Sequence, residues 1–247
     1  MNRMRSALLG LSLLGLSASA SGFQDSSFVN AGGWQPAAFW CDAGSSVLAL
    51  TRPAGDFAQA AQPTTLVRWT GLTGRSAGRE TRTPWQLGPQ DAGAGQLYTA
   101  LTPRGQPVSS SPTSFVHSSN IENTQDPAYR MTAVVAVRLP QGDFSCRYVP
   151  QAAVLAATAR HGVIVWEYRG RVTYASRNRD GTPGVQLTGG THTGAPGGEQ
   201  TYRWEKRGYV YELTVSQAGQ GGALRVLRGG RVLSREPLLA YSVSVAK

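Results

Sequence analysis

A hairpin pattern that recurs along the last hundred residues constrains the fold of this chain more than any other feature. Short apolar runs alternate with tight glycine turns at Gly170, Gly208 and Gly229. Three hairpins are expected: residues 163–168 with 171–175, residues 201–204 with 209–215, and residues 223–227 with 231–234. Together with a final strand at 238–245, they predict six or seven antiparallel strands, which fit a small barrel or a sandwich.

The first half of the chain shows the same β character less clearly. Strands are expected at residues 46–51, 64–70, 129–139 and 143–149, with weaker candidates at 97–101 and 113–117. The sequence therefore predicts an all-β protein of two antiparallel modules, each a sandwich or a small barrel, with short helical turns only. One such turn is expected where Asp56 caps residues 57–61.

Other segments are predicted to be irregular. Residues 88–127 are rich in Gly, Pro, Ser, Thr and Gln, which is typical of long surface loops. Residues 180–199 are glycine-rich and predict a long flexible loop with a strand at 185–187. Residues 151–160 fit either a short helix or a buried strand, and their length does not decide between the two.

The N-terminus has the order of a secretory signal peptide. Arg3 and Arg5 precede an apolar run at residues 7–16, and Ala18-Ser19-Ala20 supplies a small-residue cleavage pattern. The run is too short to span a bilayer, and no later segment reaches that length. We therefore expect residues 1–20 to be removed and the mature protein to be secreted, periplasmic or otherwise associated with the cell envelope.

The chain has two cysteines, Cys41 and Cys146. In an oxidising compartment two cysteines predict one disulfide, here closing a loop of about 100 residues. Neither a C-x-x-C motif nor a Cys-His spacing suggests a reactive thiol or a metal ligand. The predicted bridge lies entirely within residues 21–150.

Positive charge is concentrated in the second half of this basic protein. Residues 21–150 carry nine basic and eight acidic side chains, whereas residues 151–247 carry thirteen basic and six acidic ones. The charge shift and the disulfide span place a boundary near Pro150. We therefore predict an N-terminal β module at 21–150 and a basic C-terminal β module at 151–247.

Arginines stand beside aromatic residues in the basic module, as in surfaces that bind polyanions by stacking and ion pairing. The alternative is that the aromatic side chains fill the core while the arginines are solvated outside. The candidate binding residues are Trp166, Tyr168, Arg169, Arg171, Arg203, Trp204, Arg207, Arg225, Arg228 and Arg231.

Motifs for catalysis are weak. Residues 74–78 match G-x-S-x-G around Ser76, but no helix is expected after them, as a nucleophile elbow requires. His117, His161 and His192 lie on separate segments without metal-ligand spacing, so no metal and no cofactor are predicted. Residues 178–181 resemble part of a calcium loop but lack its alternating acidic pattern.

The leading hypothesis is a non-enzymatic binding protein that works outside the cytoplasm. Its basic module would bind an anionic polymer (a polysaccharide, lipid head groups or DNA) or an envelope protein. The alternatives are a periplasmic hydrolase that uses Ser76 or a carboxylate pair, and a protein inhibitor or assembly subunit. The sequence does not predict an oligomeric state.

Overall fold

The computed structural model describes residues 22–74, 76, 78–119, 134–147 and 149–246. Across these residues the chain forms seventeen antiparallel strands and no helix, so the predicted all-β class is confirmed. The predicted signal peptide, residues 1–20, lies outside the described residues, as does the first part of the strand expected at 129–139.

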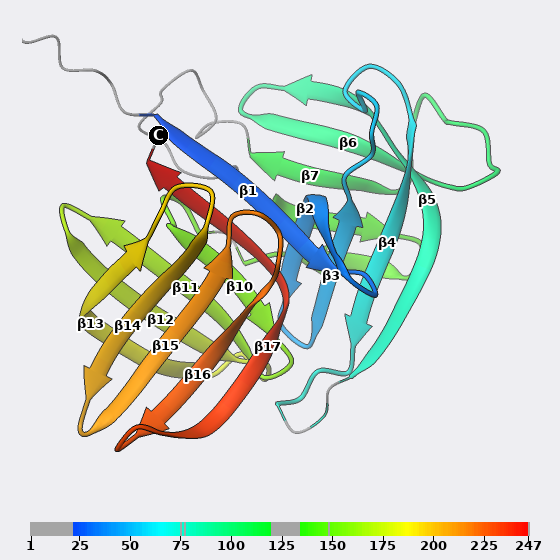
Figure 1. Ribbon diagram of the computed structural model, residues 1–247. Helices are drawn as coiled ribbons and strands as arrows, with labels where there is room; N and C mark the ends of the chain where they lie inside the picture. The colour runs from blue at the N-terminus through cyan, green and yellow to red at the C-terminus, as the bar shows by residue number, and fades with distance from the viewer. Residues whose placement is uncertain (1–21, 75, 77, 120–133, 148, 247) are drawn as a thin grey trace, which may run out of the picture.

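The last eight strands form a closed barrel (Figure 1). Each strand pairs with the next, and β10 also pairs with β17, so both edges of the sheet are hydrogen-bonded. The strands are β10 (Val154–Thr158), β11 (His161–Tyr168), β12 (Arg171–Asn178), β13 (Pro183–Gly194), β14 (Glu199–Lys206), β15 (Tyr209–Ser216), β16 (Gly222–Arg228) and β17 (Arg231–Ala246). Of the two architectures predicted for the C-terminal residues, a small barrel and a sandwich, the barrel is correct.

Alternation along the strands fills the barrel with large side chains. On β14, Tyr202 and Trp204 are at most 1% exposed, whereas Arg203 and Glu205 face solvent. Leu213 and Tyr241 are fully buried in the same core cluster. Burial of each such side chain contributes about 1.5–3 kcal/mol, which makes this core the main stabilising feature of the barrel.

The preceding strands form a second antiparallel meander, in which β2 to β9 pair in chain order. The strands are β1 (Phe23–Asn30), β2 (Trp34–Ala43), β3 (Ser46–Thr51), β4 (Gln62–Thr70), β5 (Arg79–Gly93), β6 (Gln96–Pro103), β7 (Phe115–Ser119), β8 (Val134–Leu139) and β9 (Gly142–Ser145). The predicted disulfide is confirmed: it joins Cys41 on β2 to Cys146, the residue after β9. The two ends of the meander are therefore linked covalently.

Strand β1 connects the two sets of strands. It pairs with β17 of the barrel over seven residue pairs and with β2 of the meander over three. In Figure 1 it runs along the boundary between them. The division into separate modules near residue 150 stays a prediction.

Three local predictions are wrong. Residues 56–61 form turns rather than a helical turn, because the Asp56 carboxylate accepts a hydrogen bond from Ala58 N (2.8 Å) two residues on. Within the segment predicted as long surface loops, residues 88–93, 96–103 and 115–119 belong to strands, residues 104–114 lie outside strands, and residues 120–127 are not among the described residues. The register shift between Leu87 and Gln90 takes Gly88 and Pro89 out of the ladder, so these two residues do not end strand β5.

The third error concerns residues 180–199, which contain the whole of strand β13 rather than a flexible loop with a strand at 185–187 only. One of its glycines is required by packing, because a Cβ at Gly190 would collide with the indole ring of Trp204. Residues 151–160, left open between helix and strand, contain β10.

Candidate functional site

Two neighbouring hairpin turns carry a row of cations at one end of the barrel. Arg207 and Gly208 connect β14 to β15, and both have positive φ, as a type I′ turn requires. Gly229 and Gly230 connect β16 to β17 in the same way. Cross-strand pairing aligns four residues beside these turns: Lys206, Tyr209, Arg228 and Arg231. We call Lys206, Arg207, Tyr209, Arg228 and Arg231 the basic end.

The cations of the basic end are not neutralised. Lys206, Arg207, Arg228 and Arg231 are all exposed, and within the described part of the chain none of them forms an ion pair with a carboxylate. Arg228 lies over the ring of Tyr209, with its guanidinium carbon 5.0 Å from the ring centroid. This contact holds the Arg228 side chain at the turn without changing its charge.

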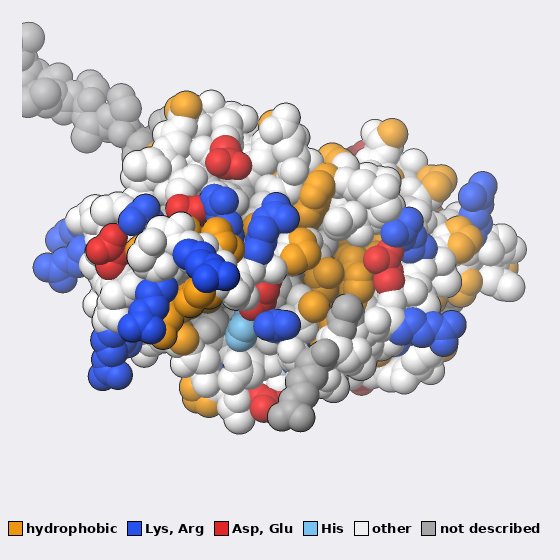
Figure 2. All heavy atoms as spheres, turned by 60° about the horizontal axis from the view of Figure 1, so that its bottom comes forward, with side chains coloured by type: hydrophobic (Ala, Val, Ile, Leu, Met, Phe, Trp, Pro, Cys, Tyr) orange, Lys and Arg blue, Asp and Glu red, His pale blue; other side chains and the backbone are white. Residues whose placement is uncertain are grey.

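Two exposed aliphatic side chains adjoin the basic end. Val232 is 46% exposed and Leu233 is 54% exposed, and both follow Arg231 at the start of β17. A β-bulge pairs Leu227 with Val232 and Val226 with Ser234, so Leu233 has no partner across the ladder. Bulges re-aim side chains in this way. In Figure 2, Lys and Arg side chains gather over the barrel part of the molecule, with hydrophobic side chains between them.

Arg203 and Arg225 lie on the outer wall of the barrel, where carboxylates neutralise them. Arg225 forms an ion pair with Glu212, and Arg203 Nη2 lies 3.1 Å from Glu205 Oε1. Register places Glu212 directly between the two arginines. These two predicted residues therefore contribute less free positive charge than the basic end.

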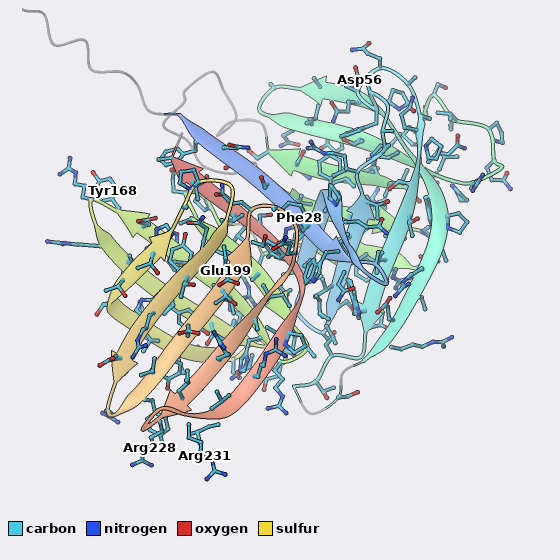
Figure 3. All side chains as sticks on the ribbon, viewed as in Figure 1. Phe28, Asp56, Tyr168, Glu199, Arg228 and Arg231 are labelled. Carbon is cyan, nitrogen blue, oxygen red and sulfur yellow. A yellow bond between two sulfur atoms is a disulfide. The ribbon has the colours of Figure 1, made fainter. Side chains whose placement is uncertain are left out.

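The first predicted hairpin lies at the opposite end of the barrel. Tyr168, Arg169 and Arg171 surround the turn between β11 and β12, and Figure 3 shows Tyr168 far from Arg228 and Arg231. Tyr168 is 67% exposed, and the guanidinium carbon of Arg169 lies 5.0 Å from its ring centroid. The predicted arginines and Tyr168 thus lie at both ends of the barrel and on its outer wall, so they do not line one common groove.

The two tryptophans of the predicted set are not surface residues of a groove. Trp204 is 1% exposed in the barrel core, where its Nε1 donates to the carbonyl of Val172 (3.3 Å). Trp166 is half-buried and packs, with Leu155 and Ile164, against the buried side chains of Val149 and Ala152. A ligand outside the barrel cannot reach Trp204, so this residue is removed from the candidate site.

The serine and the histidines that were considered for catalysis do not lie together in one site. The Oγ of Ser76 accepts a hydrogen bond from Gly78 N (3.0 Å) within its own exposed turn. His117 stacks on Tyr98, while His161 Nδ1 contacts Glu236 (3.0 Å). His192 Nδ1 lies 3.2 Å from Glu167 Oε1. Over the residues that the structure describes, no three His, Cys, Asp or Glu side chains are grouped as metal ligands.

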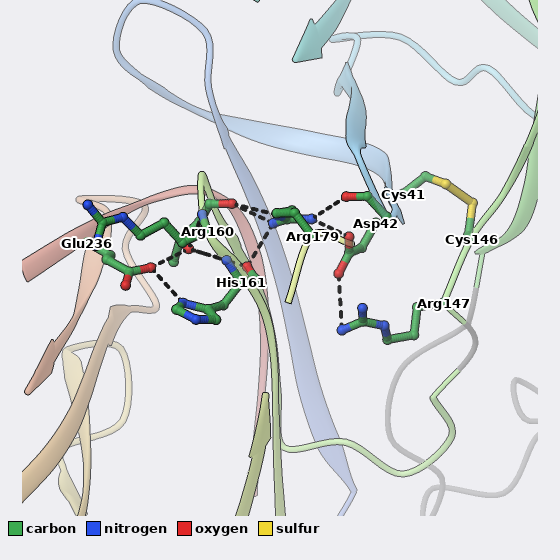
Figure 4. Close-up of polar contacts among 10 residues, drawn as sticks. Cys41, Asp42, Cys146, Arg147, Arg160, His161, Arg179 and Glu236 are labelled. Atoms are coloured by element: carbon green, nitrogen blue, oxygen red, sulfur yellow. Dashed lines mark hydrogen bonds and ion pairs between the residues drawn. A yellow bond between two sulfur atoms is a disulfide. The ribbon is translucent and has the colours of Figure 1, made fainter. Parts of the chain in front are cut away.

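Sequence reasoning missed a buried polar centre between the meander and the barrel (Figure 4). Arg179, 3% exposed, follows β12 and donates to Asp42 Oδ1 (2.6 Å) on β2. The same guanidinium donates to the carbonyl oxygens of Gly44 (3.0 Å), Thr158 and His161 (2.7 Å). Nothing in the sequence pairs positions 42 and 179, which are 137 residues apart.

In the described ranges no helix has the length and apolar character needed to cross a membrane. Comparison with protein-family models, with curated proteins and with solved structures finds no match to this chain. Its function is therefore proposed from its own side chains.

Proposed function

We propose that this is a non-enzymatic binding protein that works outside the cytoplasm and attaches to an anionic lipid surface through the basic end of its barrel. The observation that carries the proposal is the un-neutralised row of Lys206, Arg207, Arg228 and Arg231 beside exposed Val232 and Leu233. The export-type N-terminus and the disulfide support a location outside the cytoplasm.

Charge supplies the attraction. A lysine or arginine near an anionic membrane surface contributes about 1 kcal/mol, so the four cations together contribute about 4 kcal/mol at moderate salt. Arg203 and Arg225 contribute less because Glu205 and Glu212 already lie beside them. The attraction falls within about one Debye length, which means that high salt weakens it.

The aliphatic side chains favour a lipid surface over a charged polymer. Val232 and Leu233 project at the end of the barrel, next to hairpin turns that carry the cations. Apolar side chains flanked by Lys and Arg enter the boundary between head groups and acyl chains. A polysaccharide or a nucleic acid offers no apolar layer to receive them.

Vesicle co-sedimentation tests the proposal with a charge-matched control. The probe is vesicles of phosphatidylglycerol mixed with phosphatidylcholine, compared with phosphatidylcholine alone. We expect binding only to the anionic vesicles. The Arg228→Glu/Arg231→Glu variant should bind at least about thirtyfold more weakly, since two lost cations cost about 2 kcal/mol. Arg169→Glu/Arg171→Glu makes the same charge change at the opposite end and should bind nearly as well as the unaltered protein. Equal losses in both variants would contradict the assignment to the basic end.

A second variant separates lipid from polymer. Val232→Ser/Leu233→Ser keeps every charge and should weaken binding to the anionic vesicles. The same variant should leave any binding to heparin or single-stranded DNA unchanged. If vesicle binding is unaffected and polymer binding is strong, the anionic partner is a polymer and the lipid proposal is wrong.

A further inference from the structure

A cavity of about 360 Å³ lies at the boundary between the meander and the barrel. Phe39, Phe57 and Leu97 form its apolar wall on the meander side, and Leu155 and Ile164 form the wall on the barrel side. The disulfide Cys41–Cys146 lines it as well. Ligand sites occur preferentially at such boundaries, and this volume is at the small end of their range.

Two polar side chains in the cavity lining have a buried atom without a hydrogen-bond partner among the residues that the structure describes. Ser118 is fully buried, and the atom is its Oγ. Arg147 has a side chain that is 11% exposed, and the atom is its Nη1. Its contact with Asp42 Oδ2, at 3.4 Å, is an ion pair without good hydrogen-bond distance (Figure 4). A buried donor without an acceptor costs about 1–3 kcal/mol, more if it is charged.

Positive charge is in excess around Arg147. The single carboxylate of Asp42 serves two buried guanidinium groups, and Arg179 takes the better geometry, at 2.6 Å. Burial lowers the pKa of Arg147, and Asp42 only partly opposes this, while Arg177 and Arg179 lower it further. Asp25 and Arg52 also line the cavity and have opposite charges, so the excess comes from Arg179 behind Asp42.

We propose that this cavity binds a small amphipathic carboxylate, of the chemical class of a medium-chain fatty acid. The carboxylate would accept hydrogen bonds from Arg147 and Ser118, and the apolar body would lie between the walls formed by the meander and the barrel. Arginine offers a planar fork that matches a carboxylate, and a buried guanidinium is stabilised by a second anion. The proposal is independent of the basic end, which lies elsewhere on the barrel.

Isothermal titration calorimetry with decanoate tests the proposal. We expect saturable binding of decanoate, and much weaker binding of 1-decanol, which has the same apolar body without the charge. Arg147→Met should weaken decanoate binding at least about tenfold, and Ser118→Ala about threefold. Arg104→Gln removes an exposed cation from the same half of the molecule and should change nothing.

Ala38→Leu is a second test in case Arg147→Met does not fold. It narrows the cavity while Arg147 and Asp42 stay in place. It should also weaken decanoate binding. Absence of decanoate binding to the unaltered protein overturns the proposal, and so does equal binding by Arg147→Met and the unaltered protein. Arg228→Glu/Arg231→Glu should bind decanoate normally, so failure of the lipid-surface proposal and failure of this one are distinguishable.

Discussion

Strands β2–β9 and strands β10–β17 are both eight-stranded antiparallel meanders, but different bonds join their ends. In the first, the disulfide Cys41–Cys146 and one backbone hydrogen bond from Arg147 N to Asp42 O (3.0 Å) connect the last strand to the first. In the second, β10 and β17 form a ladder of five residue pairs. A ladder satisfies the backbone of both edge strands, whereas a disulfide restricts the unfolded chain. The meander should therefore depend on redox state and the barrel should not.

Removal of the disulfide tests this difference between the meander and the barrel, and it has the largest expected effect. For Cys41→Ala/Cys146→Ala we expect a loss of up to about 4–5 kcal/mol in unfolding free energy, from a loop whose ends are 105 residues apart. Hydrogen exchange should speed up in β2–β9 and stay slow in β13–β16. If exchange rises equally in both regions, the two meanders are one cooperative unit and the contrast between them fails.

Arg179 links the two regions, so its replacement should weaken both. Arg179→Met leaves Asp42 and the carbonyl oxygens of Thr158 and His161 without their buried donor. Breaking a buried pair of this kind costs about 3–5 kcal/mol, measurable by urea unfolding. Arg177→Met, on the exposed face of β12, is the matched control and should stay within about 0.5 kcal/mol of the unaltered protein. Comparable losses in the two variants would show that Arg179 is not a link.

Low pH should destabilise the closure of the barrel more than it destabilises the meander. Beyond the ladder of β10 and β17, the Glu236 carboxylate accepts hydrogen bonds from Thr158 (2.6 Å) and His161 (3.0 Å). Burial alone would raise the pKa of Glu236, but these hydrogen bonds and the charges of His161 and Arg160 bring the pKa below its usual value of 4.5.

The pKa of Glu236 is lower in the folded state than in the unfolded state. Its contribution to stability is therefore complete above about pH 4.5 and is lost as pH falls through the folded pKa. The melting temperature should fall more steeply from about pH 6 to about pH 3 for the unaltered protein than for Glu236→Gln. Asp143→Asn, which breaks an exposed pair with Arg138 on the meander, should leave the decline nearly unchanged. If the melting temperature depends on pH in the same way for Glu236→Gln and the unaltered protein, Glu236 does not stabilise the closure of the barrel.

The sequence predicted the hairpins because their signals are local. Gly170, Gly208 and Gly229 have positive φ at the turns where the glycine pattern placed them. The full length of strand β13 was missed beyond residues 185–187, because Gly190 makes room for Trp204, a contact that only the sheet register creates. Propensity cannot foresee such a contact.

The candidate site was predicted in part, for the same reason. The turn arginines Arg207, Arg228 and Arg231 were identified because hairpin tips are exposed wherever the barrel closes. The exposure of Val232 and Leu233 depends on a bulge, and the burial of Trp204 depends on which face points inward. A one-residue change in register reverses both properties.

Tryptophan reporters at the two barrel ends test the central claim most directly. Leu233→Trp places an indole beside the basic end, and Tyr168→Trp places one at the opposite end. Each variant is mixed with phosphatidylglycerol vesicles that contain brominated phosphatidylcholine, a quencher within the acyl layer. We predict that the added fluorescence at position 233 is quenched and that the fluorescence at position 168 is not. Quenching at position 168 alone, or at neither position, would contradict attachment through the basic end.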